Sequence, residues 1–401
     1  MRKNIFILLL CLMASCWGFA QNNVIESELQ TVLNQRNDDY IDINIVFKSQ
    51  ISSEELSSIG VTNDKSVRRE KMINELKRHS QATQKDVMSV LKAEEKNGNV
   101  VDVKSYWLTN FINCKAKSDV IYQLASRSDI ELISINQEME IVSDVTSGID
   151  SRDVQSATIA QHLTQVEADK VWELGYTGKG VIVAVLDSGV NTEHEDLKDH
   201  LWDGGAQYPN HGYNSFDDNI ETMDDSGHGT HCAGIICGDG TGGKQTGIAP
   251  EATLMCIKAI NNGNANVNSI ISGMEFAVEH GAQVLSMSLG IANSSVSERT
   301  LLRQTCVNTL ETGVIASVAC GNEGSSASNT IPNNVRVPGS CPAPWIHPDQ
   351  QVNPGETSCV VSVGAVTNND AVAGISSRGP VTWQNTSYGD YPYNPGIGLI
   401  R

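Results

Sequence analysis

The nine residues Ser226–Gly234 combine two histidines with three glycines, a mixture that no core helix or strand requires. Glycine allows the backbone to come close to a side chain or to a bound substrate. A histidine between glycines, such as His228, can therefore be open to chemistry while its ring is held from behind. The alternative is a turn that carries an incidental histidine pair, and the segment alone does not decide between the two.

Two other segments follow predicted strands and carry polar side chains that suit the same chemistry. Asp187 comes directly after the apolar run 181–186, and Asn322 follows the run 314–319 within Gly-Asn-Glu-Gly. At one sheet edge, an aspartate can orient an imidazole that works as general base and then as general acid. An asparagine amide can donate to the oxyanion of a tetrahedral intermediate. The three residues together predict acyl transfer, whereas each alone is compatible with a turn or loop.

A metal site is the competing chemical interpretation of the same residues. His228 and His231 are three positions apart and could share a helical face, with Asp187 as a third ligand. No further histidine or carboxylate cluster in the sequence completes a coordination shell. A metal-dependent hydrolase is therefore kept as an alternative.

The elements that must position these residues begin at about residue 166. Continuous apolar runs alternate there with stretches of helical periodicity that start near 267 and 297. This alternation predicts an α/β domain with a doubly wound, mostly parallel sheet whose strands are buried on both faces. Ligands of such sheets bind beyond the carboxyl ends of the strands. The expected strands lie at 181–186, 254–257, 284–289, 314–319 and 360–366.

The segment before this domain has a different pattern. It predicts a half-buried strand at 40–47, a long helix at 66–96, a short helix from 118 and three further strands. The order β-α-β-β-α-β is that of a small α+β split-βαβ domain of the ferredoxin-like kind. From 143 to about 164, Ser, Thr, Asp and Gln dominate, which indicates an exposed linker.

The N-terminus predicts export. Arg2 and Lys3 precede the apolar run 5–13, and Gly18-Phe19-Ala20 offers small residues for cleavage after Ala20. Acylation at Cys16, as in a lipoprotein, is a minor alternative. No later run has the apolar length to cross a bilayer, so we expect a secreted or cell-surface protein without a membrane span.

Charge and cysteine usage exclude several function classes. The net charge of −19 disfavours partners with phosphate backbones, so nucleic-acid binding is not expected. No Cys-x-x-Cys pair supports a structural zinc site. Cys341 and Cys359 flank a proline-rich loop and form the predicted disulfide, while most other cysteines lie in apolar runs and should be buried thiols.

Five motifs in order resemble those of the subtilisin-like serine peptidases, over residues 166 to 401. They are Ala184–Gly189, Gly227–His231, Ser286–Gly290, Gly321–Gly324 and Ser376–Pro380. The resemblance implies that Asp187 and His228 are two members of a catalytic triad and that Asn322 lies in the oxyanion hole.

The same resemblance assigns the surrounding positions. Ser288, Leu289 and Gly290 would form the edge that pairs with an extended peptide substrate. Gly321 would line the pocket for the residue before the scissile bond. His231 would be structural, and Cys232 would be a thiol beneath the catalytic histidine.

The resemblance also implies a domain order and ligands. Residues 1–20 would be the signal peptide, 21–150 an inhibitory propeptide with its linker, and 151–401 the peptidase domain. No cofactor is required for the chemistry. A structural Ca²⁺ is a weaker expectation at Asp196, because the loop 238–247 offers only Asp239 as a second carboxylate.

One departure from the family pattern affects the activity. The family's nucleophile lies in a Gly-Thr-Ser-Met-Ala-like segment after the Arg-Gly-Pro motif, and no such segment occurs in these 401 residues. We therefore expect that these residues form an incomplete peptidase domain, which is inactive as it stands. The full enzyme would be a secreted endopeptidase that is made as a zymogen and hydrolyses peptide bonds. The alternatives are a non-catalytic peptide-binding relative and the metal-dependent hydrolase.

Overall fold

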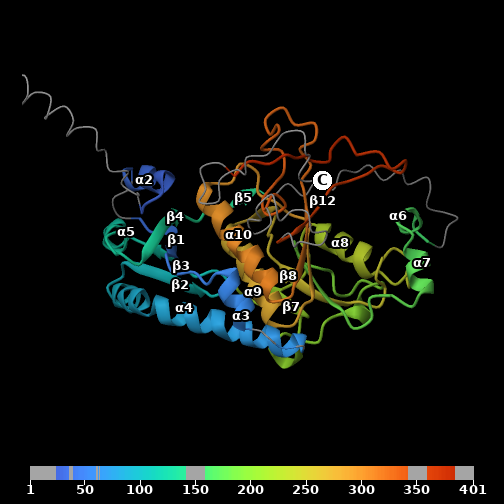
Figure 1. Cartoon of the computed structure of the whole chain (residues 1–401), viewed down its shortest axis with the longest axis horizontal. Helices are drawn as coiled ribbons and strands as arrows, with labels where there is room; N and C mark the ends of the chain where they lie inside the picture. The colour runs from blue at the N-terminus through green and yellow to red at the C-terminus, as the bar shows by residue number, and fades with distance from the viewer. Residues whose placement is uncertain are drawn as a thin grey trace, which may run out of the picture.

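The computed structural model describes residues 24–35, 39–59, 62, 64–140, 159–341 and 359–383. Two sheets organise these residues into an N-terminal and a C-terminal domain that lie side by side (Figure 1). The predicted signal peptide, the acylation alternative at Cys16 and most of the predicted linker lie outside the described residues. In the described part of the chain, no helix is long and apolar enough to cross a membrane.

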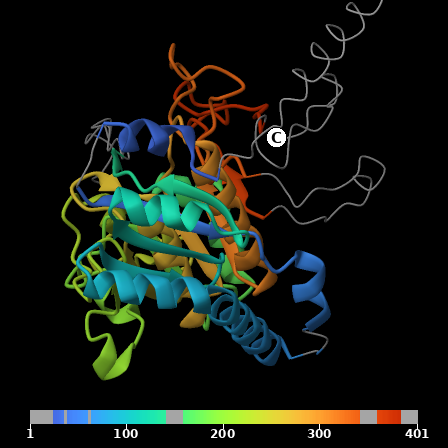
Figure 2. The same ribbon diagram turned by 90° about the vertical axis from the view of Figure 1, so that its left-hand side faces the viewer.

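The N-terminal domain has the predicted split-βαβ order. Its antiparallel sheet has the strand order β2-β3-β1-β4, which places the first strand between the third and the fourth. Figure 2, turned so that this domain faces the viewer, shows helices in front of the sheet. The elements are α2 (Ser27–Leu33), β1 (Ile41–Phe47), α3 (Ser53–Ile59), α4 (Lys65–Lys96), β2 (Val100–Tyr106), β3 (Phe111–Ala116), α5 (Ser118–Ala125) and β4 (Ile130–Ile135).

The strand predicted at 40–47 is present as β1, but it is buried on both faces, so the prediction of half-burial is wrong. One face packs with α4 and α5 in an apolar core that contains Ile43 and Leu91. The other face carries Asn44, which is 2% exposed and accepts a hydrogen bond from Asn268 of the C-terminal domain at 2.8 Å. Asn44, one of the polar residues that alternate along the strand, therefore faces a second domain instead of water.

The C-terminal domain contains the predicted parallel sheet. Its six strands have the order β12-β11-β10-β6-β8-β7, and every pair is parallel. Helix α8 (His228–Cys237) covers one face, and α9 (Val267–Glu279) with α10 (Val296–Glu311) covers the other, as a doubly wound sheet requires. The strands are β6 (Ile182–Asp187), β7 (Gly212–Asn214), β8 (Thr253–Lys258), β10 (Val284–Met287), β11 (Ile315–Ala319) and β12 (Val361–Val363).

Strand β12 differs from the prediction of burial on both faces. It is the terminal strand of the sheet, and Val361 and Val363 are 52% and 46% exposed. Ile315 of the neighbouring β11 is also 52% exposed. Among the described residues, Val360 is buried at 3% exposed, whereas the rest of the apolar run at 360–366 forms an exposed edge instead of a buried strand.

Several shorter elements lie at the start of the C-terminal domain and between the two domains. The chain re-enters the described region at 159 and forms α6 (Gln161–Gln165) and α7 (Ala168–Glu173), so the end of the predicted linker is helical. Near the end of the N-terminal domain, β5 (Met139–Glu140) pairs antiparallel with β9 (Asn264–Ala265) of the other domain. Two 3-10 turns, Lys198–His200 and Gly205–Gln207, complete the elements.

Candidate active site

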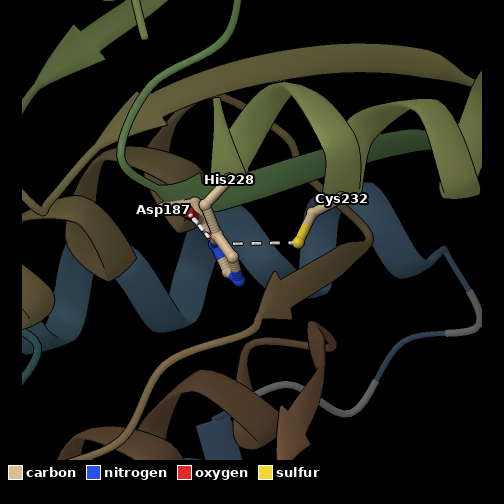
Figure 3. A group of neighbouring side chains, drawn as sticks. All are labelled: Asp187, His228 and Cys232. Carbon is tan, nitrogen blue, oxygen red and sulfur yellow. Dashed lines mark hydrogen bonds and ion pairs between the residues drawn. The ribbon is translucent and has the colours of Figure 1, made fainter. Parts of the chain in front are cut away.

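Asp187 and His228 meet at the carboxyl edge of the parallel sheet. Asp187 is the last residue of β6, and His228 is the first residue of α8. Nδ1 of His228 donates a hydrogen bond to Oδ1 of Asp187 at 2.6 Å, as the close-up in Figure 3 shows. The Asp187 side chain is fully buried, whereas that of His228 is 13% exposed. The carboxylate therefore fixes one ring nitrogen and leaves the imidazole within reach of solvent.

The surroundings favour the protonated form of His228. Burial disfavours the imidazolium, but the hydrogen bonds to Asp187 and Cys232 and the charge of Asp187 outweigh burial and raise the pKa of His228 to about 10. Oδ1 of Asp187 also accepts the backbone N–H of Ser188 at 2.7 Å, so the carboxylate cannot rotate away from the ring without losing a second bond. This arrangement suits a residue that must stabilise positive charge on the imidazole.

Cys232, and not His231, is the third reactive side chain at this position. Its Sγ lies one helical turn along α8, 3.9 Å from Nδ1 of His228 (Figure 3). Among the described residues, Asp187, His228 and Cys232 are the one group of potential metal ligands, and His231 is exposed outside it. The histidine pair of the metal alternative is therefore not brought together.

A second layer of hydrogen bonds, which was not predicted from the sequence, supports the pair. Asp224 accepts the backbone N–H groups of Ser226, Gly227 and Thr230 at the start of α8, at 2.8–3.0 Å. Ser188 Oγ donates to Asp224 at 2.8 Å, which ties the residue after Asp187 to the same carboxylate. The available signal was an acidic residue four positions before His228, which is typical of a helix N-terminus.

Lys258 is the second supporting residue that the sequence analysis missed. It ends β8 beside Asp187 in the sheet register, and its side chain is 7% exposed. Its Nζ donates to the carbonyl oxygen of Ser188 at 2.7 Å and lies 2.8 Å from Oδ2 of Asp225. The lysine thus joins the strand end that carries Asp187 to the loop before His228. A lysine at the end of an otherwise apolar strand was the signal in the sequence.

Glycine is required where α8 approaches β6. A Cβ on Gly229 would lie 2.0 Å from the carbonyl oxygen of Gly189 and 3.2 Å from Cβ of Asp187. Gly189 itself has φ +101°, a conformation that other residues rarely adopt. These glycines therefore let the helix carrying His228 come against the strand carrying Asp187.

The remaining predicted site residues follow β10, which neighbours β6 in the sheet, and β11, which lies on the other side of β10. Asn322 is exposed and lies three residues after the end of β11 at Ala319, and Gly321 before it has φ +114°. The predicted substrate-pairing residues 288–290 follow β10, with Ser288 half-buried and Leu289 and Gly290 buried. All of them lie beyond the carboxyl ends of adjacent strands, on the edge that holds Asp187.

A buried ion pair, also absent from the sequence analysis, lies against two of these positions. Arg336 donates to Glu323 from Nε at 2.7 Å, and the two side chains are 11% and 8% exposed. A Cβ on Gly290 would lie 2.6 Å from Cβ of Arg336, and one on Gly321 would lie 2.4 Å from Oε2 of Glu323. Ser377 Oγ donates to the same Oε2 at 3.0 Å. The pair therefore fills the space between the ends of β10 and β11.

Asp196 is the residue at which a structural Ca²⁺ was expected. Oδ1 of Asp196 accepts the backbone N–H of Gly242 at 2.5 Å, so the loop binds this oxygen directly. Asp239 accepts the N–H of Thr241 and lies 3.1 Å from Nε2 of His200. Calcium prefers six to eight oxygen ligands. Within the described residues, these carboxylates are not part of a group of three His, Cys, Asp or Glu ligands, and the calcium site stays a prediction.

The predicted Cys341–Cys359 disulfide is absent from the structure, which contains both residues as buried free thiols. They are nevertheless neighbours, because Sγ of Cys359 lies 3.8 Å from the carbonyl oxygen of Cys341. The other cysteines of the C-terminal domain are free and, apart from Cys232, buried, as predicted.

The structure is an α/β protein with a doubly wound parallel sheet, in which a buried aspartate at one strand end is hydrogen-bonded to a histidine that starts a helix. A model of the subtilase family (peptidase S8) matches residues 178–394, more than half of the chain. The chain belongs to the subtilase family, and the predicted resemblance is confirmed.

Curated relatives agree with this assignment. The chain is 34% identical to subtilisin DY of Bacillus licheniformis over 225 residues, which are 55% of this chain and 69% of the relative. It is 34% identical to the major intracellular serine protease of Bacillus subtilis (strain 168) over 49% of this chain and 59% of the relative. The match to the minor extracellular protease Vpr of the same strain is 28% identical over 64% of this chain and 33% of that protein. The chain spans about half the length of several other subtilisins that it matches.

Proposed function

We propose that this chain belongs to an exported serine endopeptidase in which Asp187 and His228 activate a serine hydroxyl. The observation that carries the proposal is the 2.6 Å hydrogen bond between a fully buried carboxylate and the ring of a partly exposed histidine. Asp187 holds the Nδ1 tautomer, so Nε2 is the nitrogen that takes the proton of the attacking hydroxyl. The same nitrogen then returns the proton to the leaving amine.

In this proposal, the segments beyond β10 and β11 bind the peptide. The amide of Asn322 donates to the oxyanion of the tetrahedral intermediate. Residues 288–290 pair with the backbone of the extended substrate, and Gly321 lines the pocket for the residue before the scissile bond. Side chains alone supply the proton transfers, so the proposed reaction needs no cofactor.

We further propose that the N-terminal domain is an inhibitory propeptide. Support comes from the contact surface between the domains, where Glu275 of α9 accepts the backbone N–H groups of Trp107 and Leu108 at 2.6 and 2.7 Å. The end of the domain at Met139–Glu140 pairs as a strand with Asn264–Ala265. The chain therefore leaves the N-terminal domain already extended along the other domain, as a self-cleaved segment must be.

The proposal is tested on the reading frame extended beyond Arg401 until it includes a Gly-Thr-Ser segment. His228→Ala in that protein should abolish both removal of the N-terminal domain and hydrolysis of a peptide substrate, because no base remains to accept the serine proton. Normal maturation of the variant would contradict the assignment. His231→Ala is the matched control, since this exposed histidine lies outside the group of reactive side chains.

A non-catalytic peptide-binding relative is the second candidate, favoured by the β5–β9 pairing, which uses backbone alone. A stop codon directly after Arg401, together with peptide binding that survives His228→Ala, would support this candidate. A serine-directed phosphonylating reagent that labels the extended protein would exclude it.

A further inference from the structure

One segment of the C-terminal domain is hydrogen-bonded to the chain beyond both β10 and β11. The backbone N–H of Arg336 donates to the carbonyl oxygen of Cys320 at 3.0 Å, and Cys320 directly precedes the glycine predicted to line the substrate pocket. Val337 pairs antiparallel with Ile291 through two backbone hydrogen bonds of 2.8 and 3.2 Å, directly after the predicted substrate-pairing residues 288–290. Arg336 is therefore fixed between the two segments that are proposed to bind the peptide.

The side chain of Arg336 lies against a glycine of each segment. A Cβ on Gly290 would lie 2.6 Å from Cβ and 3.2 Å from Cδ of Arg336. A Cβ on Gly321 would lie 3.1 Å from Cγ of the same side chain and 2.4 Å from Oε2 of Glu323. A methyl group at either position would force its neighbours to move. The ion pair of Arg336 and Glu323 therefore occupies the space between the two glycines.

The same ion pair is neutral as a whole and firmly held. One carboxylate oxygen of Glu323 accepts Nε of Arg336 at 2.7 Å, and the other accepts Oγ of Ser377 at 3.0 Å. The backbone of Glu323 is bound as well, since its carbonyl oxygen accepts Nδ2 of Asn334 at 2.5 Å. Separating a buried ion pair leaves an uncompensated charge. A bound peptide would therefore lose much of its affinity if its side chain had to displace either residue.

We propose that Arg336 and Glu323 form the floor of the pocket for the residue before the scissile bond, so that the enzyme cleaves after small, uncharged residues such as alanine and serine. This inference rests on the proposed function, because it concerns the substrate of that same site. A long apolar side chain would have to displace the ion pair. A charged side chain would meet two groups that already neutralise each other, and it would be buried without a partner. Arg336 is thus a residue that determines specificity.

The test uses the enzyme extended beyond Arg401 and internally quenched peptides that differ only in the residue before the scissile bond. The value of kcat/KM is measured with alanine, leucine, phenylalanine, lysine and glutamate at this position. We expect alanine to be preferred over each of the other four by about 10-fold or more. Cleavage after any of the four that is as fast as cleavage after alanine would overturn the inference. Cleavage of none of the peptides would contradict the proposed function itself, and the inference with it.

Two variants separate the volume of the ion pair from its charge. Arg336→Ala removes the bulk and leaves Glu323 without its partner, so cleavage after lysine should rise by about 10-fold or more relative to alanine. Adding Glu323→Gln also removes the negative charge, so cleavage after leucine and phenylalanine should rise, whereas cleavage after lysine should not. An unchanged ranking in the active variants would overturn the role of Arg336.

Arg378→Ala is the matched control for the loss of an arginine. This residue is exposed, and its backbone N–H donates to Asn334 at 2.6 Å, a bond that the substitution keeps. The control should therefore retain the preference for alanine, and a change equal to that of Arg336→Ala would overturn the assignment to Arg336. If a variant fails to fold, the ranking of the five peptides by the unaltered enzyme decides.

Discussion

The charge of His228 depends mainly on one oxygen atom of Asp187. Asp187→Asn keeps the shape of the side chain but removes its negative charge, so we expect the pKa of His228 to fall from about 10 by about 1–3 units. NMR titration of the imidazole signals in the 401-residue chain measures this change directly. An unchanged titration would show that Asp187 does not set the protonation of His228.

The same substitution predicts a change in stability with pH. The pKa of His228 is raised above its ordinary value of 6.5, so its protonation stabilises the fold fully below about pH 6.5 and is lost as the pH rises through about 10. The unfolding free energy of the unaltered chain should therefore decline across this range more than that of Asp187→Asn. Urea unfolding at pH 6 and pH 10 checks the difference between the two proteins.

Cys232 makes a smaller contribution to the same titration. Its hydrogen bond raises the pKa of His228, so Cys232→Ser should lower that pKa by less than Asp187→Asn does. The matched control is Cys237→Ser on the same helix, because Sγ of Cys237 contacts the carbonyl oxygen of Ala233 and not the ring. Equal shifts in both variants would mean that the thiol acts through the helix and not through its contact.

At the scale of elements, the contact of α8 with β6 decides whether the pair can form. Gly229→Ala would place a methyl group 2.0 Å from the backbone oxygen of Gly189, so the helix must move. We expect a loss of about 1–3 kcal/mol or more in unfolding free energy and weakening of the Asp187–His228 bond. Denaturant unfolding and the His228 titration measure the two effects.

Gly234→Ala is the control for this prediction. It lies on the same helix, but nothing stands within 4 Å of the position that its Cβ would take. Alanine is favoured over glycine inside helices by about 1 kcal/mol, so this variant should be neutral or slightly more stable. If both variants lost stability equally, helix propensity and not the close approach would be the cause.

Elements whose signal is local could be predicted from the sequence, and elements whose burial depends on distant neighbours could not. The helix α4 shows its periodicity within its own residues, and the prediction of 66–96 agrees with Lys65–Lys96. The burial of Asn44 and the exposure of Val361 depend on which surface another element covers. Apolar or alternating patterns alone do not contain that information.

The candidate site follows the same rule. Asp187 and His228 stand in motifs, so the sequence indicated both, and the structure places them in contact. Asp224 and Lys258 act through backbone groups of other segments, and such contacts leave no spacing pattern in the sequence. The predicted roles of Asn322 and of residues 288–290 stay predictions, because they concern a substrate.

At the scale of the whole molecule, Glu275 links the stability of the two-domain chain to pH. Burial raises the pKa of Glu275 to about 7, although the N–H groups of Leu108 and Trp107 act in the opposite direction. Its contribution to stability is therefore greatest below about pH 4.5 and is lost as the pH rises through about 7. Glu275→Gln, which has no charge to bury, should remove this part of the pH dependence in urea unfolding between pH 5 and pH 8.

Glu275→Ala separates the charge from the hydrogen bonds. The glutamine still offers an oxygen to both backbone N–H groups, whereas the alanine leaves two buried donors without an acceptor. We expect the alanine variant to lose about 1–3 kcal/mol for each donor at every pH. A glutamine variant as unstable as the alanine variant would show that the charge itself holds the domains together.

The open face of β11 and β12 has a consequence for how the protein behaves in concentrated solution. Exposed valines and isoleucines beside a terminal strand form a surface on which a second copy can add its own strand. The net charge of −19 keeps copies apart at low ionic strength, but salt shortens the reach of that repulsion to about 10 Å at 0.1 M. Light scattering should therefore increase as sodium chloride is added, and Val361→Lys should suppress the increase. Repulsion between the acidic surfaces would then be what prevents copies of the protein from associating through this sheet.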